Sequence, residues 1–345
     1  MKYNQLGSST LRVSEVALGT MTFGNQNSAA EAAEQLDVAF DHGVNLVDAA
    51  EMYPVPPRPE HQGRTEEFIG QWLVRQNRER VVLATKIAGP GRNFEWLRGG
   101  PKAVDRANLQ AALEASLRRL RTDYVDLYQI HWPDRYVPTF GQGSFNPAEE
   151  RPTVDIAEQL AGFAELIKAG KVRYVGLSNE TPWGIAAFVA AARAAGLPKV
   201  VSVQNAYNLT NRVFDLYPAE AAHREQVGLL AYSPLAFGVL TGKYLEGAPP
   251  GSRGALFPGF NARYLKPNVE PATRAYLELA RQHGLKPSAL ALAFVRSRWF
   301  VSSTLLGATT RAQLEENLAS LEVSLSPAIL AEIDAIHARY PNPAP

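Results

Sequence analysis

The chain has 345 residues, 46% of them hydrophobic and 20% charged, a composition typical of a globular protein with a large core. Its formal net charge is +1 and it has no block of Lys or Arg, so neither nucleic acid nor an anionic membrane is indicated as a partner. Cysteine is absent, which excludes disulfides, thiolate catalysis, Cys-ligated zinc and iron–sulfur clusters.

The first residues do not form the apolar core of a signal peptide, and no apolar run is long enough to cross a bilayer. We therefore expect a cytoplasmic protein that does not bind membranes. Short β-branched runs then alternate with longer amphipathic stretches. In the first half, the predicted strands are 16–18, 44–48, 81–86 and 124–131, and the predicted helices are 28–42, 64–75, 105–120 and 153–168.

The second half repeats this alternation. Its predicted strands are 172–178, 200–204, 228–232 and 301–307, and its predicted helices are 181–195, 213–226, a pair within 270–299, and 310–320. A last helix, 326–338, is additional, and Ser326-Pro327 gives it a cap followed by proline at its first position.

About eight β/α units with buried strands predict a parallel (β/α)8 TIM barrel, and no linker divides residues 1–345 into two domains. We expect residues 2–14 to form an N-terminal β-hairpin that plugs one end, and extra C-terminal helices to follow the barrel. Long segments at 89–104, 133–152 and 236–269 each follow a strand. In a TIM barrel, loops after strands lie on the catalytic face, so these three should surround the active site.

Chemically complementary side chains stand at the ends of three consecutive predicted strands. Asp48 ends one strand and Tyr53 follows in its loop, while Lys86 and His131 end the next two. Consecutive barrel strands are neighbours, so these groups should converge at one rim. A tyrosine has a pKa of about 10, and a nearby cation favours its phenolate, so Lys86 would bring Tyr53 closer to the working range of an acid.

The two other groups complete this interpretation. Asp48 would offset the cost of burying the charge of Lys86, and His131 would orient a carbonyl oxygen or share the proton transfer. Each residue alone is typical of a turn, a cap or packing. As a set, Asp48, Tyr53, Lys86 and His131 indicate acid catalysis on a carbonyl group.

Four segments carry a family resemblance. Gly43–Tyr53 resembles the signature of the aldo-keto reductase superfamily, and Leu113–His131 resembles its second signature. The resemblance continues through Gly170–Asn179 and Ala231–Leu235, so it covers nearly the whole chain. The Pro-rich stretch 52–60 and the ending 340–345 are most similar to the bacterial Tas-like reductases, which are related to potassium-channel β subunits.

The resemblance implies NADPH-dependent reduction of aldehydes or ketones to alcohols, with NADPH extended across the barrel mouth. No Gly-x-Gly-x-x-Gly follows a predicted strand, so a Rossmann module is not indicated. Carried over by position, the residues expected around the nicotinamide are Gly19, Thr20, Met21, Asp48, Ser178, Asn179, Gln204 and Tyr232. Those expected along the phosphates and adenosine are Ser233, Pro234, Leu235, Gly238, Lys243, Arg253, Gly307, Thr309, Gln313, Glu316 and Asn317.

Two cations, Lys243 and Arg253, favour NADP(H) over NAD(H), although a solvated surface role for both stays open. Tyr53, His131 and Trp132 are the expected substrate contacts. Phe23, Phe94 and Tyr207 are further candidates for the substrate wall.

Two other functions remain open. A Schiff-base lyase would use Lys86 as its nucleophile, and a regulatory or redox-sensing subunit would bind NADPH with slow turnover. The six histidines are scattered without a metal-binding motif, so we expect no metal. The expected partner is a small aldehyde or ketone, and the sequence leaves the oligomeric state open.

Overall fold

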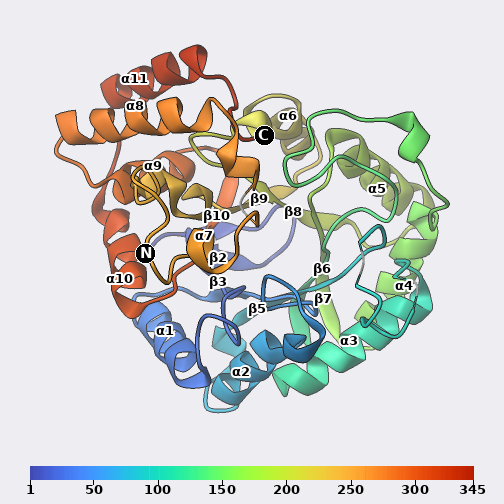
Figure 1. Ribbon diagram of the computed structural model, residues 1–345. Helices are drawn as coiled ribbons and strands as arrows, with labels where there is room; N and C mark the ends of the chain where they lie inside the picture. Colours follow the sequence, from blue (N-terminus) through green and yellow to red (C-terminus); the bar gives the residue numbers. More distant parts are fainter. Residues whose placement is uncertain (93, 101, 261) are drawn as a thin grey trace.

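A computed structural model describes residues 1–345 except 93, 101 and 261. Eight parallel strands close into a barrel in the order β10-β3-β4-β5-β6-β7-β8-β9, with helices around it (Figure 1). The strands are β3 (Val16–Gly19), β4 (Leu46–Asp48), β5 (Val82–Ile87), β6 (Val125–Ile130), β7 (Val172–Ser178), β8 (Val200–Ala206), β9 (Gly228–Tyr232) and β10 (Val301–Leu306). The predicted TIM barrel is confirmed.

Most helices form a ring outside the strands. They are α1 (Ala29–Asp41), α2 (Arg64–Leu73), α3 (Arg106–Leu120), α4 (Ile156–Lys168), α5 (Pro182–Ala195), α6 (Tyr217–Arg224), α9 (Pro287–Arg296) and α10 (Arg311–Ala319). Helices α8 (Val269–Gln282) and α11 (Pro327–Arg339) pack on each other beyond that ring, at the upper left of Figure 1. Ser28 and Ser326 cap α1 and α11 as predicted, because each side chain accepts a backbone N–H of the first turn.

One predicted helix is divided. The stretch 213–226 forms a 3₁₀ turn, η4 (Val213–Asp215), followed by α6, because the backbone of Leu216 leaves the helical region before Pro218. Within the long loops, short helical segments are present that periodicity did not predict. They are η3 (Pro147–Glu149), η5 (Ala236–Thr241), α7 (Arg253–Leu256) and η6 (Ala262–Leu265).

The interior of the barrel changes from apolar to polar along its length. Leu46, Ala84 and Leu127 belong to one buried apolar cluster together with Leu6 of the N-terminal hairpin. This hairpin, β1 (Tyr3–Gln5) and β2 (Arg12–Ser14), therefore plugs the barrel as predicted. At its turn, a Cβ on Gly7 would lie 2.1 Å from the backbone oxygen of Val201, so only glycine fits there.

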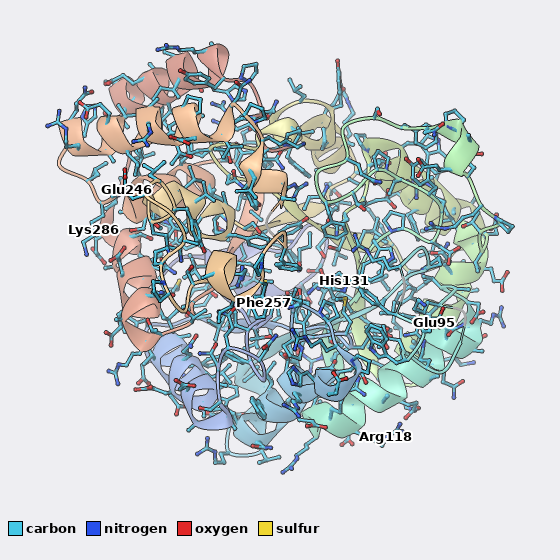
Figure 2. The ribbon with its side chains drawn as sticks, in the orientation of Figure 1. Glu95, Arg118, His131, Glu246, Phe257 and Lys286 are labelled. Atoms are coloured by element: carbon cyan, nitrogen blue, oxygen red, sulfur yellow. The ribbon has the colours of Figure 1, made fainter. Side chains whose placement is uncertain are left out.

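Side chains alternate between the two faces of a strand. Asp48, Lys86 and Gln129 each lie two residues after one of these apolar residues (Leu46, Ala84 and Leu127). They therefore share the interior face with them, at the carboxyl ends of β4, β5 and β6. Figure 2 shows His131, which follows β6, near the middle of the ring of helices, whereas Arg118 and Lys286 lie at its periphery. Among the described residues, no helix is both long and apolar enough to span a membrane.

Candidate active site

The ends of β4 and β5 hold a buried ion pair. Lys86 Nζ lies 2.6 Å from Asp48 Oδ2 and 2.8 Å from the backbone oxygen of Ala49, and both charged side chains are at most 2% exposed. Lys86 Nζ also lies 3.4 Å from the Tyr53 hydroxyl, and the rings of Tyr53 and His131 are 5.6 Å apart edge-on. The structure thus brings together all four residues that the sequence predicted to converge.

Two glutamines hold the other oxygen of Asp48. The side-chain N–H groups of Gln129 and Gln204 donate to Asp48 Oδ1 at 3.1 and 2.8 Å, and Gln204 also donates to Gln129 Oε1 at 3.2 Å. Gln129 was missed from the sequence because a lone glutamine suggests no chemistry. Its place two residues before His131, within the strand that the sequence predicts over 124–131, was the signal that could have found it.

The protonation states follow from burial and from these contacts. Burial lowers the pKa of Lys86, but Asp48 and Tyr53 outweigh it and the net shift is upward, so the ammonium stays charged. Burial raises the pKa of Tyr53 against the opposing effect of Lys86. The expected direction for Tyr53 was therefore wrong, because desolvation of the phenolate outweighs the cation.

His131 is neutral in this environment. Burial and the charges of Lys86 and Arg92 place its pKa well below the ordinary value of 6.5. Its Nδ1 is buried without a hydrogen-bond partner among the described residues. A neutral imidazole is able to donate a hydrogen bond to a carbonyl oxygen but is not a strong competing acid.

The loop that carries Tyr53 is anchored by a second buried ion pair. Glu51, 2% exposed, pairs with Arg98 from the segment after β5 and also accepts the backbone N–H of Ala88 at 2.7 Å. The Tyr53 backbone oxygen accepts the N–H of Gly63 at 2.9 Å. These bonds fix the loop that positions the phenol. Sequence reasoning missed Glu51 and Arg98 because neither lies in a regular pattern.

The residues expected around a nicotinamide line the same mouth. The Asn179 side chain donates to the His131 backbone oxygen at 2.8 Å and accepts the Tyr232 hydroxyl at 2.7 Å. Ser178 donates to the Gln204 backbone oxygen at 2.8 Å. Asn179 has a φ of 53°, a left-handed conformation that asparagine adopts more readily than most residues. On the opposite side, Gly19 ends β3, Thr20 donates to the Asp48 backbone oxygen at 2.8 Å, and the partly buried Met21 packs beside Tyr53.

The segment after β9 turns sharply next to Lys243 and Arg253. Ser233, Ala236, Phe237 and Gly238 all have positive φ, with Pro234 and Leu235 between them. Within this turn, the N–H of Ala236 donates to the Ser233 backbone oxygen at 2.9 Å, and that of Gly238 donates to the Leu235 backbone oxygen at 2.8 Å. A Cβ on Gly238 would lie 2.8 Å from Lys243 Nζ, so this glycine lets the exposed lysine lie against the turn.

Arg253, at the start of α7, lies over the Phe237 ring with its guanidinium carbon 4.6 Å from the ring centroid. Its Nε is buried without a hydrogen-bond partner in the described part of the chain. Burial lowers the pKa of this arginine, since no described carboxylate pairs with it. An unpaired, desolvated cation beside the turn fits a phosphate group.

The residues expected at the adenosine end surround the start of α10. Thr309 donates to Gln313 Oε1 at 3.0 and 3.1 Å through its N–H and hydroxyl, and Asn317 donates to the Gly307 backbone oxygen at 3.4 Å. Glu316 accepts the Ser288 hydroxyl at 2.6 Å and pairs with Lys286, and the Ser288 bond lowers its pKa. Glu316 is therefore already bonded to its neighbours at the start of α9.

Comparison with known proteins gives the family. Residues 15–338 match the sequence profile of the Aldo/keto reductase family. The chain belongs to the aldo/keto reductase family. It is 50% identical to Protein tas of Escherichia coli over the full length of both chains. It is 33% identical to a probable voltage-gated potassium channel subunit beta of Arabidopsis thaliana, covering 97% and 96% of the two chains. It is 31% identical to L-glyceraldehyde 3-phosphate reductase of E. coli, covering 97% and 92%.

Aldo/keto reductases act on small carbonyl substrates with a nicotinamide cofactor. In this aldo/keto reductase, Trp132 and the partly buried Phe94 pack with Tyr53 in an apolar cluster at the mouth. Two of the other aromatic candidates for a substrate wall were wrong. Phe23 and Tyr207 are fully buried in the core between barrel and helices, where Tyr207 stacks on Phe294 and donates to Asp215.

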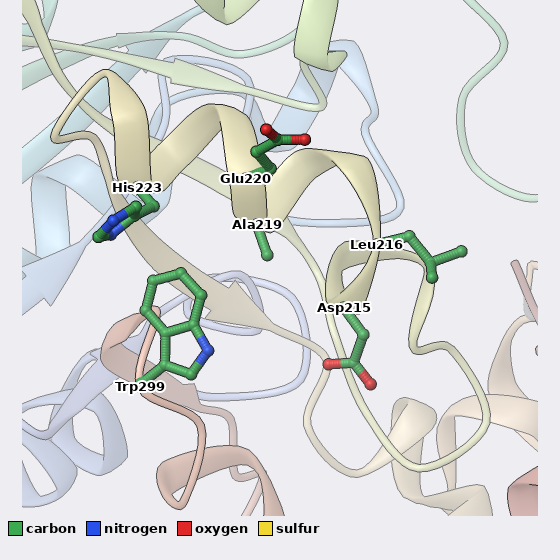
Figure 3. A pocket seen from close by; sticks show the side chains of 6 residues that line it. All are labelled: Asp215, Leu216, Ala219, Glu220, His223 and Trp299. Atoms are coloured by element: carbon green, nitrogen blue, oxygen red, sulfur yellow. The ribbon is translucent and has the colours of Figure 1, made fainter.

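One groove of this aldo/keto reductase lies away from the predicted site. It has a volume of about 360 Å³ and is lined by Asp215, Leu216, Ala219, Glu220, His223 and Trp299. Figure 3 shows Ala219 and His223 of α6 pointing toward Trp299, which lies in the segment that leads into β10. No predicted site residue lines it, so it has no role in the chemistry described above.

Proposed function

We propose that the chain reduces aldehydes or ketones to alcohols with NADPH, with Tyr53 as the general acid. The observation that carries this proposal is the approach of Tyr53, Lys86 and His131 at the barrel mouth, where Lys86 lies 3.4 Å from the phenol. Asp48 keeps the ammonium charged in a buried place.

The donor set fits an extended nicotinamide dinucleotide phosphate. Arg253 has an unpartnered buried Nε, and the turn containing Gly238 brings Lys243 to the same side of the mouth. Ser178, Asn179, Gln204 and Tyr232 would hold the nicotinamide end, and residues 307–317 the adenosine end. When bound, NADPH supplies the hydride that reduces the carbonyl carbon.

The side chains of the site orient the carbonyl oxygen and supply its proton. His131, neutral and buried, orients the carbonyl oxygen toward the Tyr53 hydroxyl. As negative charge develops on that oxygen, the Tyr53 O–H bond breaks and the proton passes to it, which completes the alcohol. The phenolate left on Tyr53 faces the Lys86 ammonium, which stabilises it. Trp132 and the cluster around it exclude water from this step.

Two observations weigh against a Schiff-base lyase. A raised pKa keeps Lys86 protonated, and its Nζ is already bonded to Asp48 and Ala49, whereas a nucleophilic amine must be unprotonated.

The test is the oxidation of NADPH with a panel of aldehydes and ketones, for the parent and Tyr53→Phe. We expect the variant to bind NADPH normally and to lose about 10²–10⁴-fold in kcat, the usual effect of a general acid. Tyr3→Phe, at the plugged end, is the matched control and should keep full activity. Retained turnover in Tyr53→Phe would refute the assignment. Tight NADPH binding without turnover in the parent would instead support the regulatory alternative.

The cofactor preference has its own test. Lys243→Ala and Arg253→Ala should weaken NADPH binding much more than NADH binding, because only NADPH carries the additional phosphate. Equal losses for the two cofactors would show that these cations do not bind that phosphate.

A further inference from the structure

A second unpaired cation among the described residues lies at the barrel mouth, beside Trp132 and Phe140. Arg92 is in the segment after β5, with its guanidinium carbon 4.1 Å from the Phe140 ring centroid and 5.1 Å from that of Trp132. Among the described residues, no carboxylate pairs with Arg92 and no acceptor hydrogen-bonds its guanidinium. Two other arginines near the mouth do have carboxylate partners, since Arg98 pairs with Glu51 and Arg135 with Glu180.

Arg92 is close to the reacting groups. Arg92 and His131 share Trp132 as a neighbour, since a Trp132 ring centroid lies 5.1 Å from the guanidinium carbon and one lies 4.9 Å from the imidazole centroid. Its charge contributes to the depressed pKa of His131, after burial and Lys86. The side chain is partly buried, and this burial lowers the pKa of Arg92 itself.

The segment that carries Arg92 is packed in place. Trp132 Nε1 donates to the Pro90 backbone oxygen at 2.8 Å. A Cβ on Gly89 would lie 2.7 Å from the Trp132 backbone oxygen, and one on Gly91 would overlap the Arg151 guanidinium. Arg151 in turn donates to the backbone oxygen of Asp134 at 3.1 Å. The two glycines therefore let the chain lie against Trp132 and Arg151, which sets where Arg92 projects.

A partly desolvated guanidinium without a counter-ion attracts an anion more strongly than a fully exposed one does. Stacking on aromatic rings uses the face of the guanidinium and leaves its N–H edge free for a carboxylate or phosphate. Trp132 and Phe94, whose ring centroids lie 6.2 Å apart, belong to the same apolar cluster as Tyr53.

We propose that Arg92 binds the anionic group of the substrate, so that the preferred substrates are aldehydes or ketones bearing a carboxylate or a phosphate. This inference rests on the proposed carbonyl reduction. Arg92 is then a specificity-determining residue: it holds the far end of the substrate while the carbonyl lies between Tyr53 and His131.

The test compares matched anionic and neutral carbonyl compounds with the enzyme and NADPH. One pair is succinate semialdehyde and its methyl ester, and the other is glycolaldehyde phosphate and glycolaldehyde. We expect the parent to prefer the anionic member of at least one pair, and the pair with the larger preference identifies the anion. Arg92→Met should lower kcat/KM for the anionic compound about 10- to 100-fold, mainly by raising KM. The same variant should change kcat/KM for the matched neutral compound by less than about twofold.

Arg75→Met, an exposed arginine just beyond α2, is the control for net charge and should not change the preference. Arg92→Lys should recover part of the loss, because an ammonium keeps the charge but not the bidentate geometry. The proposal is overturned if the parent does not have a higher kcat/KM for either anionic compound than for its neutral match. It is also overturned if Arg92→Met lowers kcat/KM equally for the two compounds of a pair. Failure to reduce any compound, neutral ones included, would instead refute the proposed function.

Discussion

Replacing Asp48 with Asn tests the buried ion pair on which the site depends. The change removes the negative charge beside Lys86, whose side chain is fully buried. The amide nitrogen of Asn would face either the Lys86 ammonium or the N–H groups of Gln129 and Gln204, which are all donors. Removing one partner of a buried pair destabilises a protein by about 3–5 kcal/mol, and we expect a loss of this size in the free energy of unfolding.

The dependence of this loss on pH identifies its cause. Burial lowers the pKa of Lys86, but in the parent Asp48 and Tyr53 reverse the shift, so the folded pKa lies above the ordinary value of 10.5. The stabilisation that the ion pair gives the parent is therefore complete below pH 10.5 and is lost only as pH rises through the raised folded pKa. Without Asp48, burial should bring the folded pKa below 10.5. Between this lowered folded pKa and the unfolded pKa of 10.5, the unfolded variant binds more protons than the folded one. The free energy of unfolding of Asp48→Asn should therefore rise with pH in this range, by at most about 1.4 kcal/mol per pH unit.

The assay is urea unfolding followed by far-UV circular dichroism, at neutral and at mildly alkaline pH. Lys86→Met combined with Asp48→Asn should recover part of the loss, because no unpaired charge remains. Glu270→Gln, which breaks an exposed pair with Arg274, is the control and should change the stability by less than about 1 kcal/mol. A loss in Asp48→Asn that equals the control, or that does not change with pH, would refute the reasoning.

Three further predictions concern other parts of the fold. Because the pKa of His131 lies well below 6.5, kcat/KM for reduction should not fall as pH drops through 6.5, and a loss with that midpoint, absent in His131→Gln, would contradict a neutral imidazole. Gly7→Ala should lower the thermal midpoint much more than Gly170→Ala, since both have positive φ but only Gly7 meets a backbone oxygen, and equal shifts would exclude the steric cause. Arg98→Met leaves Glu51 buried without its cation, so burial raises the pKa of Glu51 further. The stability of Arg98→Met relative to the parent should therefore fall as pH rises from the raised folded pKa of Glu51 in the parent to its higher folded pKa in the variant, and a constant difference in thermal unfolding across pH would argue against this.

The convergence of the four site residues could be predicted because it depends on two regular features. Strand order makes β4, β5 and β6 neighbours, and each predicted strand ended within a few residues of its polar side chain. Gln129 obeys the same alternation, yet its amide does not indicate a reaction by itself. Glu51 and Arg98 could not be paired from sequence, because their contact depends on the path of two irregular loops.

Aromatic residues and pKa values were harder to predict for a common reason, which is that burial is a property of the folded chain. Phe23 and Phe94 look alike in the sequence, but one is in the core and the other at the mouth. The expected shift of Tyr53 considered the cation alone. With the phenol only 8% exposed, desolvation becomes the larger effect and reverses the sign.

This reversal strengthens the case for Tyr53 as an acid. A donor that ionised early would place a phenolate beside the substrate before the carbonyl oxygen needed a proton. In the proposed mechanism, burial prevents this by holding the proton on Tyr53, and Lys86, kept charged by Asp48, would stabilise the phenolate only once it forms. Burial also keeps His131 neutral, so at neutral pH its imidazole carries a single N–H proton. That N–H donates a hydrogen bond but is too weak an acid to transfer its proton. In the proposed mechanism, burial thus separates the two roles, with a phenol that transfers a proton and an imidazole that only orients the oxygen that receives it.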